Sequence, residues 1–244
     1  MFGTYLRLIY AFIKAFWILF VQFPHLDRKS QGSEIQKWSA ETLKLLGVSV
    51  EVIGDIDITL ANRPYLIVAN HISWLDPLVI QTLQHSIFVA KHEVSQWPIV
   101  GHIAKGCEVV FVDRGSASSA RKMVQSMTDV LQRNMCIAGF PEGTSTEGRQ
   151  VGLFHSNLFE AAVTTNCKVI ALSLRYKDPD TQAIRLEPAF VGEISFLQSL
   201  HQVICAPPMV VQVVVSSPIA PQGHTRRTLA QFAQGKVESQ LRLL

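Results

Sequence analysis

The chain has 244 residues, a length that suits one α/β domain with a complete core. Charged residues make up 17% of the chain and apolar residues 48%. Because soluble proteins carry about 25% charged residues, this deficit indicates a very apolar core or a surface that meets lipid. The net charge of +3, without clustered Lys and Arg, argues against nucleic acid as a partner. The four cysteines form no C-x-x-C pair, so we expect no metal site, and a reducing compartment is the simplest interpretation.

The N-terminal segment 6–23 is apolar and rich in aromatic residues. It is slightly short for a membrane span, which needs about 20 residues. Lys14 also lies near its centre, where a charge costs at least about 2.5 kcal/mol. Three interpretations therefore stay open: a helix in the membrane interface, a span, or a buried core helix.

Basic residues follow this segment at Arg28, Lys29 and Lys37, as expected beside an anionic cytoplasmic leaflet. We expect residues 1–30 to associate with the cytoplasmic face of a membrane, as a monotopic or single-pass anchor. Residues 31–244 then form the folded domain.

The rest of the chain alternates between the periodicities of helices and strands. Helices are predicted at 31–46, 78–83, 97–105, 118–132, 158–164 and 225–243. Strands are predicted at 48–53, 65–69, 87–90, 108–112, 135–140, 169–176 and 209–215. This alternation predicts a single α/β domain with a mixed, mostly parallel sheet flanked by helices. The loops at the strand ends are where such folds place their chemistry.

A histidine and an aspartate follow the strand at 65–69, in the sequence Asn-His-Ile-Ser-Trp-Leu-Asp-Pro. On an unbroken helix His71 and Asp76 would lie about 140° apart, so they meet only if the chain turns between them. Pro77 favours such a turn, because it disfavours helical geometry at Asp76 and suits the first turn of a helix. Asp76 would then hold one imidazole nitrogen, and the other would accept a proton from a hydroxyl. The alternative is that Asp76 merely caps a helix and His71 ends a strand.

Two further strand ends carry a charged residue beside a glycine: Phe-Pro-Glu-Gly-Thr-Ser at 140–145 and Phe-Val-Asp-Arg-Gly at 111–115. Gly143 would let backbone N–H groups approach an anion, and Glu142 would bind substrate hydroxyls. Arg114 suits a phosphate or carboxylate headgroup, because its guanidinium matches both in a fork. An ordinary turn and a surface ion pair of little energy are the alternatives.

Together, the blocks 70–76, 111–115 and 140–144 resemble the ordered motifs of the glycerolipid acyltransferases of the lysophosphatidic acid type. The intervening Ala-Lys-His-Glu-Val at 90–94 and Trp-Pro-Ile-Val-Gly at 97–101 are similar to that family as well. The resemblance covers roughly residues 38–215 and implies that the domain at residues 31–244 is an α/β acyltransferase domain.

In that family's chemistry, His71 is the general base and Asp76 orients it. The acceptor hydroxyl attacks an acyl-CoA or acyl-carrier-protein thioester directly. The resemblance implies a membrane lipid as partner and no cofactor besides the donor thioester. It also implies an acceptor site lined by Lys91, Arg114, Glu142, Gly143 and Thr144.

The third block departs from the family, because Gly143-Thr144 is followed by Ser145 where an arginine is usual. Arg149 would have to replace it from further along the loop. The first hypothesis is transfer to 1-acylglycerol-3-phosphate. A lyso-ornithine or other amino-lipid acceptor is the alternative, which the missing arginine favours. A non-catalytic lipid-binding scaffold is the third.

Overall fold

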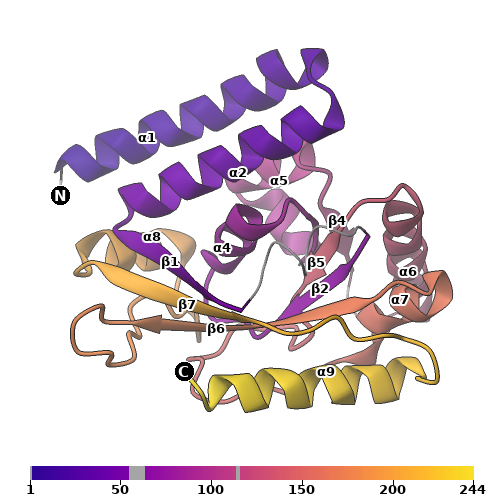
Figure 1. Ribbon diagram of the computed structural model, residues 1–244. Helices are drawn as coiled ribbons and strands as arrows, with labels where there is room; N and C mark the ends of the chain where they lie inside the picture. Colours follow the sequence, from indigo (N-terminus) through magenta and orange to yellow (C-terminus); the bar gives the residue numbers. More distant parts are fainter. Residues whose placement is uncertain (1, 55–63, 114–115) are drawn as a thin grey trace.

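The β-branched segments of the sequence form the strands of one twisted sheet. The structure, a computed structural model, describes residues 2–54, 64–113 and 116–244. These residues contain a seven-stranded sheet of order β1-β7-β6-β2-β5-β3-β4 (Figure 1). The strands are β1 (Val48–Ile53), β2 (Leu66–Ala69), β3 (Ile87–Lys91), β4 (Val110–Val112), β5 (Ile137–Gly139), β6 (Val169–Lys177) and β7 (Met209–Val215). Neighbours pair in parallel except β6 and β7, so the predicted mixed, mostly parallel sheet is confirmed.

Helices cover both faces of the sheet (Figure 1). One face carries α1 (Phe2–Trp17), α2 (Arg28–Leu45), α4 (Asp76–Leu83), α5 (Val100–Gly106) and α8 (Phe196–Cys205). The other face carries α6 (Ala117–Gln132), α7 (Phe159–Thr165) and α9 (Arg226–Leu241). Each layer buries its own hydrophobic core against the sheet. The strand β2 is central, and its four residues are all 0% exposed, so the residues that follow it start from a rigid position.

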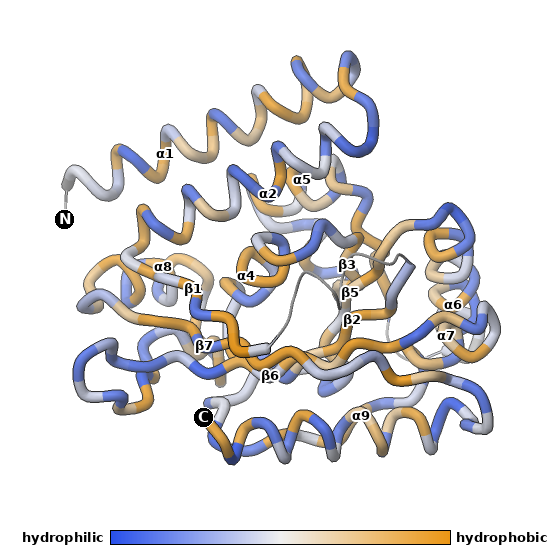
Figure 2. The backbone as a smooth tube through the Cα atoms, viewed as in Figure 1, coloured by the Kyte–Doolittle hydropathy of each residue, from blue (hydrophilic) through white to orange (hydrophobic). Residues whose placement is uncertain are grey.

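The N-terminal helix lies along the domain, and Figure 2 shows that it is apolar over most of its length. After Trp17 it continues as a π-helical turn, Ile18–Gln22, and a 3₁₀ turn, Phe23–His25. The stretch Gly3–His25 is long and apolar enough to cross a membrane. Yet it is tied to α2, since the indole of Trp38 donates to the carbonyl of Ala11 at 2.8 Å.

The two faces of α1 differ in exposure. Its inner face enters the protein core through Leu8, Ala11 and Ala15, and the buried side continues to Ile18 and Leu19 in the π-helical turn. Its outer face exposes Leu6, Ile9, Tyr10, Ile13 and Trp17, and the stripe continues to Phe20 and Val21. The charge of Lys14 is paired with Glu41 of α2 at 2.5 Å.

This packing bears on the predicted segment boundary. The boundary between residues 30 and 31 falls within the first turn of α2, and the inner face of α1 belongs to the same core as the sheet. The N-terminal segment is therefore integrated with the domain in structure, whatever its relation to a membrane.

The helices α8 and α5 differ from the sequence prediction. The helix α8 was not predicted, although Ser195 and Gln198 form a capping box at its start that marks a helix N-terminus. The helix predicted from residue 97 begins only at Val100. The residue before it, Ile99, has φ of +64°, and the N–H of Val100 donates to the carbonyl of Pro98 at 2.7 Å, so a tight turn separates this helix from Trp97.

Candidate active site

The sheet brings together the loops after β2 and β5, because parallel strands end at the same edge. Asn70 fixes the start of the first loop. Its side-chain amide donates to the carbonyl of Leu174 at 3.0 Å and accepts from the Leu174 N–H at 2.8 Å. The amide thus extends the pairing of β2 with β6 by one side chain, and it sets the direction in which His71 leaves the sheet.

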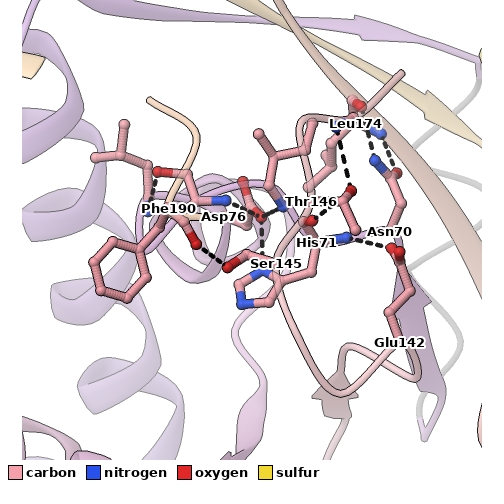
Figure 3. A network of polar contacts seen from close by, with 12 residues as sticks. Asn70, His71, Asp76, Glu142, Ser145, Thr146, Leu174 and Phe190 are labelled. Atoms are coloured by element: carbon pink, nitrogen blue, oxygen red, sulfur yellow. Dashed lines mark hydrogen bonds and ion pairs between the residues drawn. The ribbon is translucent and has the colours of Figure 1, made fainter. Parts of the chain in front are cut away.

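His71 and Asp76 meet as the sequence predicts, because the chain turns between them (Figure 3). The imidazole Nδ1 lies 2.8 Å from Oδ2 of Asp76. The same oxygen accepts the backbone N–H groups of Ile72 at 2.7 Å and Ser73 at 2.9 Å. Asp76 is the first residue of α4 and is 0% exposed. It therefore holds the histidine and the turn that precedes the helix. It does not cap α4, because the N-cap is Leu75 and no side chain caps this end of the helix.

The other oxygen of Asp76 binds Tyr176, a residue that the sequence analysis did not select. The phenol hydroxyl of Tyr176 donates to Oδ1 at 2.8 Å. Burial, and then the charge of Asp76, raise the pKa of Tyr176 well above its ordinary value, so it stays a protonated donor. No motif in the sequence indicates this contact, because a tyrosine in an apolar strand such as β6 looks like a packing residue.

The contact with Asp76 uses only one of the two ring nitrogens of His71. A carboxylate only accepts hydrogen bonds, so Nδ1 carries the proton and Nε2 is the acceptor. The ring stacks on Phe140 with 4.0 Å between centroids and 12° between planes. The His71 side chain is 23% exposed. A neutral imidazole nitrogen at a partly open position is what a general base needs.

Glu142 has contacts that differ from the expected role of gripping a substrate. Its Oε1 accepts the N–H of His71 at 2.8 Å, and its Oε2 accepts the N–H of Gly152 at 2.8 Å. The side chain is buried, and a methyl group at Gly152 would lie 2.6 Å from Oε2. The buried Glu142 side chain therefore connects the loop after β2, through His71, to the far part of its own loop, through Gly152. Desolvation raises its pKa, although the two backbone donors and His71 act in the opposite direction.

The loop after Glu142 closes over the histidine segment. Thr146 donates its N–H to the carbonyl of His71 at 2.8 Å. Gly148 has φ of +72°, and a methyl group there would lie 2.4 Å from Cδ1 of Ile72, so only glycine allows this approach. The hydroxyl of Ser145 donates to the carbonyl of Phe190, as Figure 3 shows.

Of the remaining predicted acceptor residues, those that the structure describes lie at the same edge of the sheet. Gly143 has φ of +67°, but its N–H donates to the carbonyl of Phe140 at 3.0 Å, so it closes a turn. Thr144 is exposed, and Lys91 is the exposed last residue of β3. Arg114 lies outside the described residues. Among the described residues, no group of three or more His, Cys, Asp or Glu side chains is placed to hold a metal ion.

Arg149, the candidate replacement for the missing arginine, is engaged at the surface. Its Nε lies 3.0 Å from Oε2 of Glu147. Both side chains are more than half exposed, at 60% and 51%. The two charges flank Gly148, so they sit on the loop that closes over the histidine segment.

An apolar cavity of about 210 Å³ adjoins the site, between the α1–α2 pair and the sheet. Its wall includes Leu8, Phe12, Trp38, Trp74, Phe88 and Trp97. The ring of Phe88 stacks against Phe140 with 6.2 Å between centroids, and Phe140 in turn stacks on His71. No pattern in the sequence indicates this cavity, because its wall comes from segments far apart in the chain.

The fold and the site define a class of protein: an α/β protein with an aspartate-held histidine at the carboxyl edge of its sheet and an apolar cavity beside it. A model of the acyltransferase family matches residues 49–175. The chain belongs to this acyltransferase family, and it is an acyltransferase.

Similar proteins agree with this assignment. The lyso-ornithine lipid O-acyltransferase of Pseudomonas aeruginosa is 32% identical over 203 residues, which are 82% of this chain and 75% of that one. The 1-acyl-sn-glycerol-3-phosphate acyltransferase of Neisseria gonorrhoeae is 34% identical over 113 residues, 46% of this chain and 44% of that one. The crystal structure of the 1-acyl-sn-glycerophosphate acyltransferase of Thermotoga maritima has the same fold. Its TM-score is 0.69 at 20% identity, with 98% of this chain and 97% of that one covered.

The raised pKa of Glu142 predicts a pH dependence of stability. Folded Glu142 binds its proton more tightly than the unfolded chain does, so the free energy of unfolding falls as pH rises from the ordinary glutamate pKa through the raised one. Glu142→Gln removes this slope. It also adds a constant cost, because an amide accepts only one of the two N–H donors. Urea unfolding of both proteins across this range measures the difference, and parallel pH curves would contradict the prediction.

Proposed function

We propose that this protein is an O-acyltransferase that moves a fatty acyl chain from a thioester donor to the hydroxyl of a lysolipid, with His71 as its general base. The observation that carries the proposal is the 2.8 Å contact between Nδ1 of His71 and Asp76, which leaves Nε2 to face a substrate. Acyl-CoA and acyl-carrier protein are the two donors considered. A scaffold protein would need no such buried, fully bonded carboxylate beside a partly open histidine.

The residues suggest a direct transfer. Nε2 of His71 takes the proton of the acceptor hydroxyl as its oxygen attacks the thioester carbonyl. The carbon–sulfur bond then breaks, and the thiolate leaves with the proton held by His71. Asp76 stabilises the imidazolium between these steps without taking a proton itself. The apolar cavity next to Phe140 suits the acyl chain, because burying hydrocarbon contributes about 0.8 kcal/mol per CH₂.

The charges near His71 favour an amino-lipid acceptor as the second, finer proposal. The sequence puts 1-acylglycerol-3-phosphate first, but the Ser145 hydroxyl binds the carbonyl of Phe190 and brings no positive charge. Glu147 and Arg149 instead present one charge of each sign over the histidine loop. A zwitterionic headgroup with an ammonium and a carboxylate, as in lyso-ornithine lipid, matches this pair. A phosphate monoester carries up to two negative charges near neutral pH, and Glu147 would repel it.

We also propose that α1 lies in the membrane interface on the cytoplasmic side rather than crossing the bilayer. Its inner face packs on the domain, and Lys14 is paired within the protein. Its outer stripe exposes large apolar side chains, which is the composition of an interfacial helix. This placement brings the cavity, whose wall includes Leu8 and Phe12 of α1, next to the lipid that supplies the acceptor.

His71→Ala should abolish transfer while the protein stays folded, because loss of a general base typically costs about 10²–10⁴-fold. The measurement is acceptor-dependent thiol release from an acyl-CoA, with thermal unfolding as the check on the fold. His155→Ala is the matched control, because the exposed His155 side chain lies outside the site and the substitution keeps the main-chain hydrogen bond of His155 to Pro141. Turnover near the wild-type rate by a folded His71→Ala protein would refute the mechanism.

Glu147→Gln should shift acceptor preference away from the amino lipid and toward lysophosphatidic acid. Exposed ion pairs contribute about 0.2–1 kcal/mol, so we expect the ratio of kcat/KM values to change about two- to fivefold. The ratio is measured with lyso-ornithine lipid and lysophosphatidic acid in the same micelles. Asp180→Asn, on an exposed turn, is the control for a lost negative charge. An unchanged ratio means that residue 147 does not contribute to the choice of acceptor headgroup.

Replacing Ile9 and Ile13 together by serine should weaken binding to vesicles of anionic phospholipid by about tenfold or more, since burying one such side chain contributes about 1.5–3 kcal/mol. Both residues are more than half exposed, at 55% and 61%, so the melting temperature should not fall. Leu243→Ser is the control, because Leu243 is 82% exposed and follows α9 on the opposite face of the sheet. Equal vesicle binding by both variants would place the membrane contact elsewhere.

A further inference from the structure

The strap, residues 187–195, is the second half of the connection between β6 and α8. It lies beyond the family match, which ends at residue 175. Its main chain contacts both loops of the site. The N–H of Phe190 donates to the carbonyl of Ile72 at 2.8 Å, and its carbonyl accepts the hydroxyl of Ser145 (Figure 3). Ala189 is buried and Val191 packs against the same core, so the strap is fixed on both sides of this residue. Phe190 therefore holds the histidine loop and the loop after β5 together.

The ring of Phe190, unlike its main chain, contacts the wall of the apolar cavity. It meets Trp97 edge to face, with 6.0 Å between centroids and 75° between planes. Trp97 lines the cavity and also contacts Phe196 at 5.5 Å. Phe196 in turn meets Trp74, which lies between His71 and Asp76 in the chain, at 5.2 Å. Aromatic pairs of this kind have preferred geometries, so a shift of the Trp97 ring changes the preferred position of the Phe190 ring.

We propose that Phe190 is a positioning residue that couples occupancy of the apolar cavity to the placement of His71. An acyl chain that fills the cavity lies against Trp97, and Trp97 fixes the ring of Phe190. The main-chain N–H of Phe190 in turn holds the carbonyl of Ile72, the residue after His71. A long chain thus stabilises the productive position of the base, and a short chain that leaves Trp97 untouched does not. The inference rests on the proposed function, because it requires an acyl donor in the cavity.

Phe190→Leu tests the coupling, because leucine keeps the two main-chain hydrogen bonds and an apolar side chain but removes the ring. We expect kcat with a palmitoyl thioester to fall about three- to tenfold, below the roughly 10²-fold that a full misplacement of a catalytic group costs. With a hexanoyl thioester kcat should stay within about twofold, on the same reasoning, and KM for the palmitoyl donor should change little. Phe232→Leu, at an exposed phenylalanine of α9, is the matched control.

A second readout does not depend on turnover. A palmityl thioether of CoA cannot transfer its chain, and it should slow hydrogen exchange in the peptide that contains Thr146, whose N–H binds the His71 carbonyl at 2.8 Å. The slowing should appear in the wild type and be lost in Phe190→Leu.

Three results would overturn the coupling: an equal loss of kcat with both donors, no loss with either, or exchange protection retained in Phe190→Leu. A wild type without acceptor-dependent thiol release overturns the proposed function instead. In that case the exchange experiment still decides whether an acyl chain in the cavity reaches the histidine loop through Phe190.

Discussion

The carboxylate of Asp76 has no exposed surface, and four donors converge on it. A buried charge is tolerated only when it is fully bonded, because an uncompensated one costs several kcal/mol. This requirement forces the chain to turn between His71 and Asp76, starts α4 at the aspartate, and fixes the tautomer of the imidazole. It also ties β6 to the site through Tyr176. The histidine is thus oriented by the same contacts that make the buried charge tolerable.

A second set of contacts holds the outer surface of the histidine loop. Glu142 accepts the N–H of His71. Thr146 donates to the carbonyl of His71, and Phe190 donates to the carbonyl of Ile72. Backbone groups in a turn must find partners when water is excluded, and here the partners come from two other segments, the loop after β5 and the stretch around Phe190. The base is therefore rigid without belonging to a helix or strand, and the space beside it is left to the apolar cavity. This arrangement suits a substrate whose reactive end is polar and whose remainder is hydrocarbon.

For the apolar N-terminal segment, composition allows several placements and packing selects among them. Its hydropathy allows an interfacial helix, a span or a core helix alike. The choice turns on which residues pack inward, and that depends on α2, whose Trp38 and Glu41 bind Ala11 and Lys14. Similarly, Glu142 in a Pro-Glu-Gly turn looks like a surface ligand until the loop folds inward and Gly152 and the His71 N–H meet its two oxygens.

The sequence by itself determined the parts of this protein that depend on neighbours in the chain. The β-branched runs predicted the strands of the sheet, and Asn70 to Pro77 predicted the bend that joins His71 to Asp76, because a proline after the aspartate restricts the local backbone. Only the tertiary structure decided the contacts between distant segments: Tyr176 on Asp76, Phe190 on the histidine loop, and a cavity with α1 as one wall. The physical reason is that each of these contacts depends on burial and on strand register. Both are set by several segments together, so the residue types of one segment do not predict them.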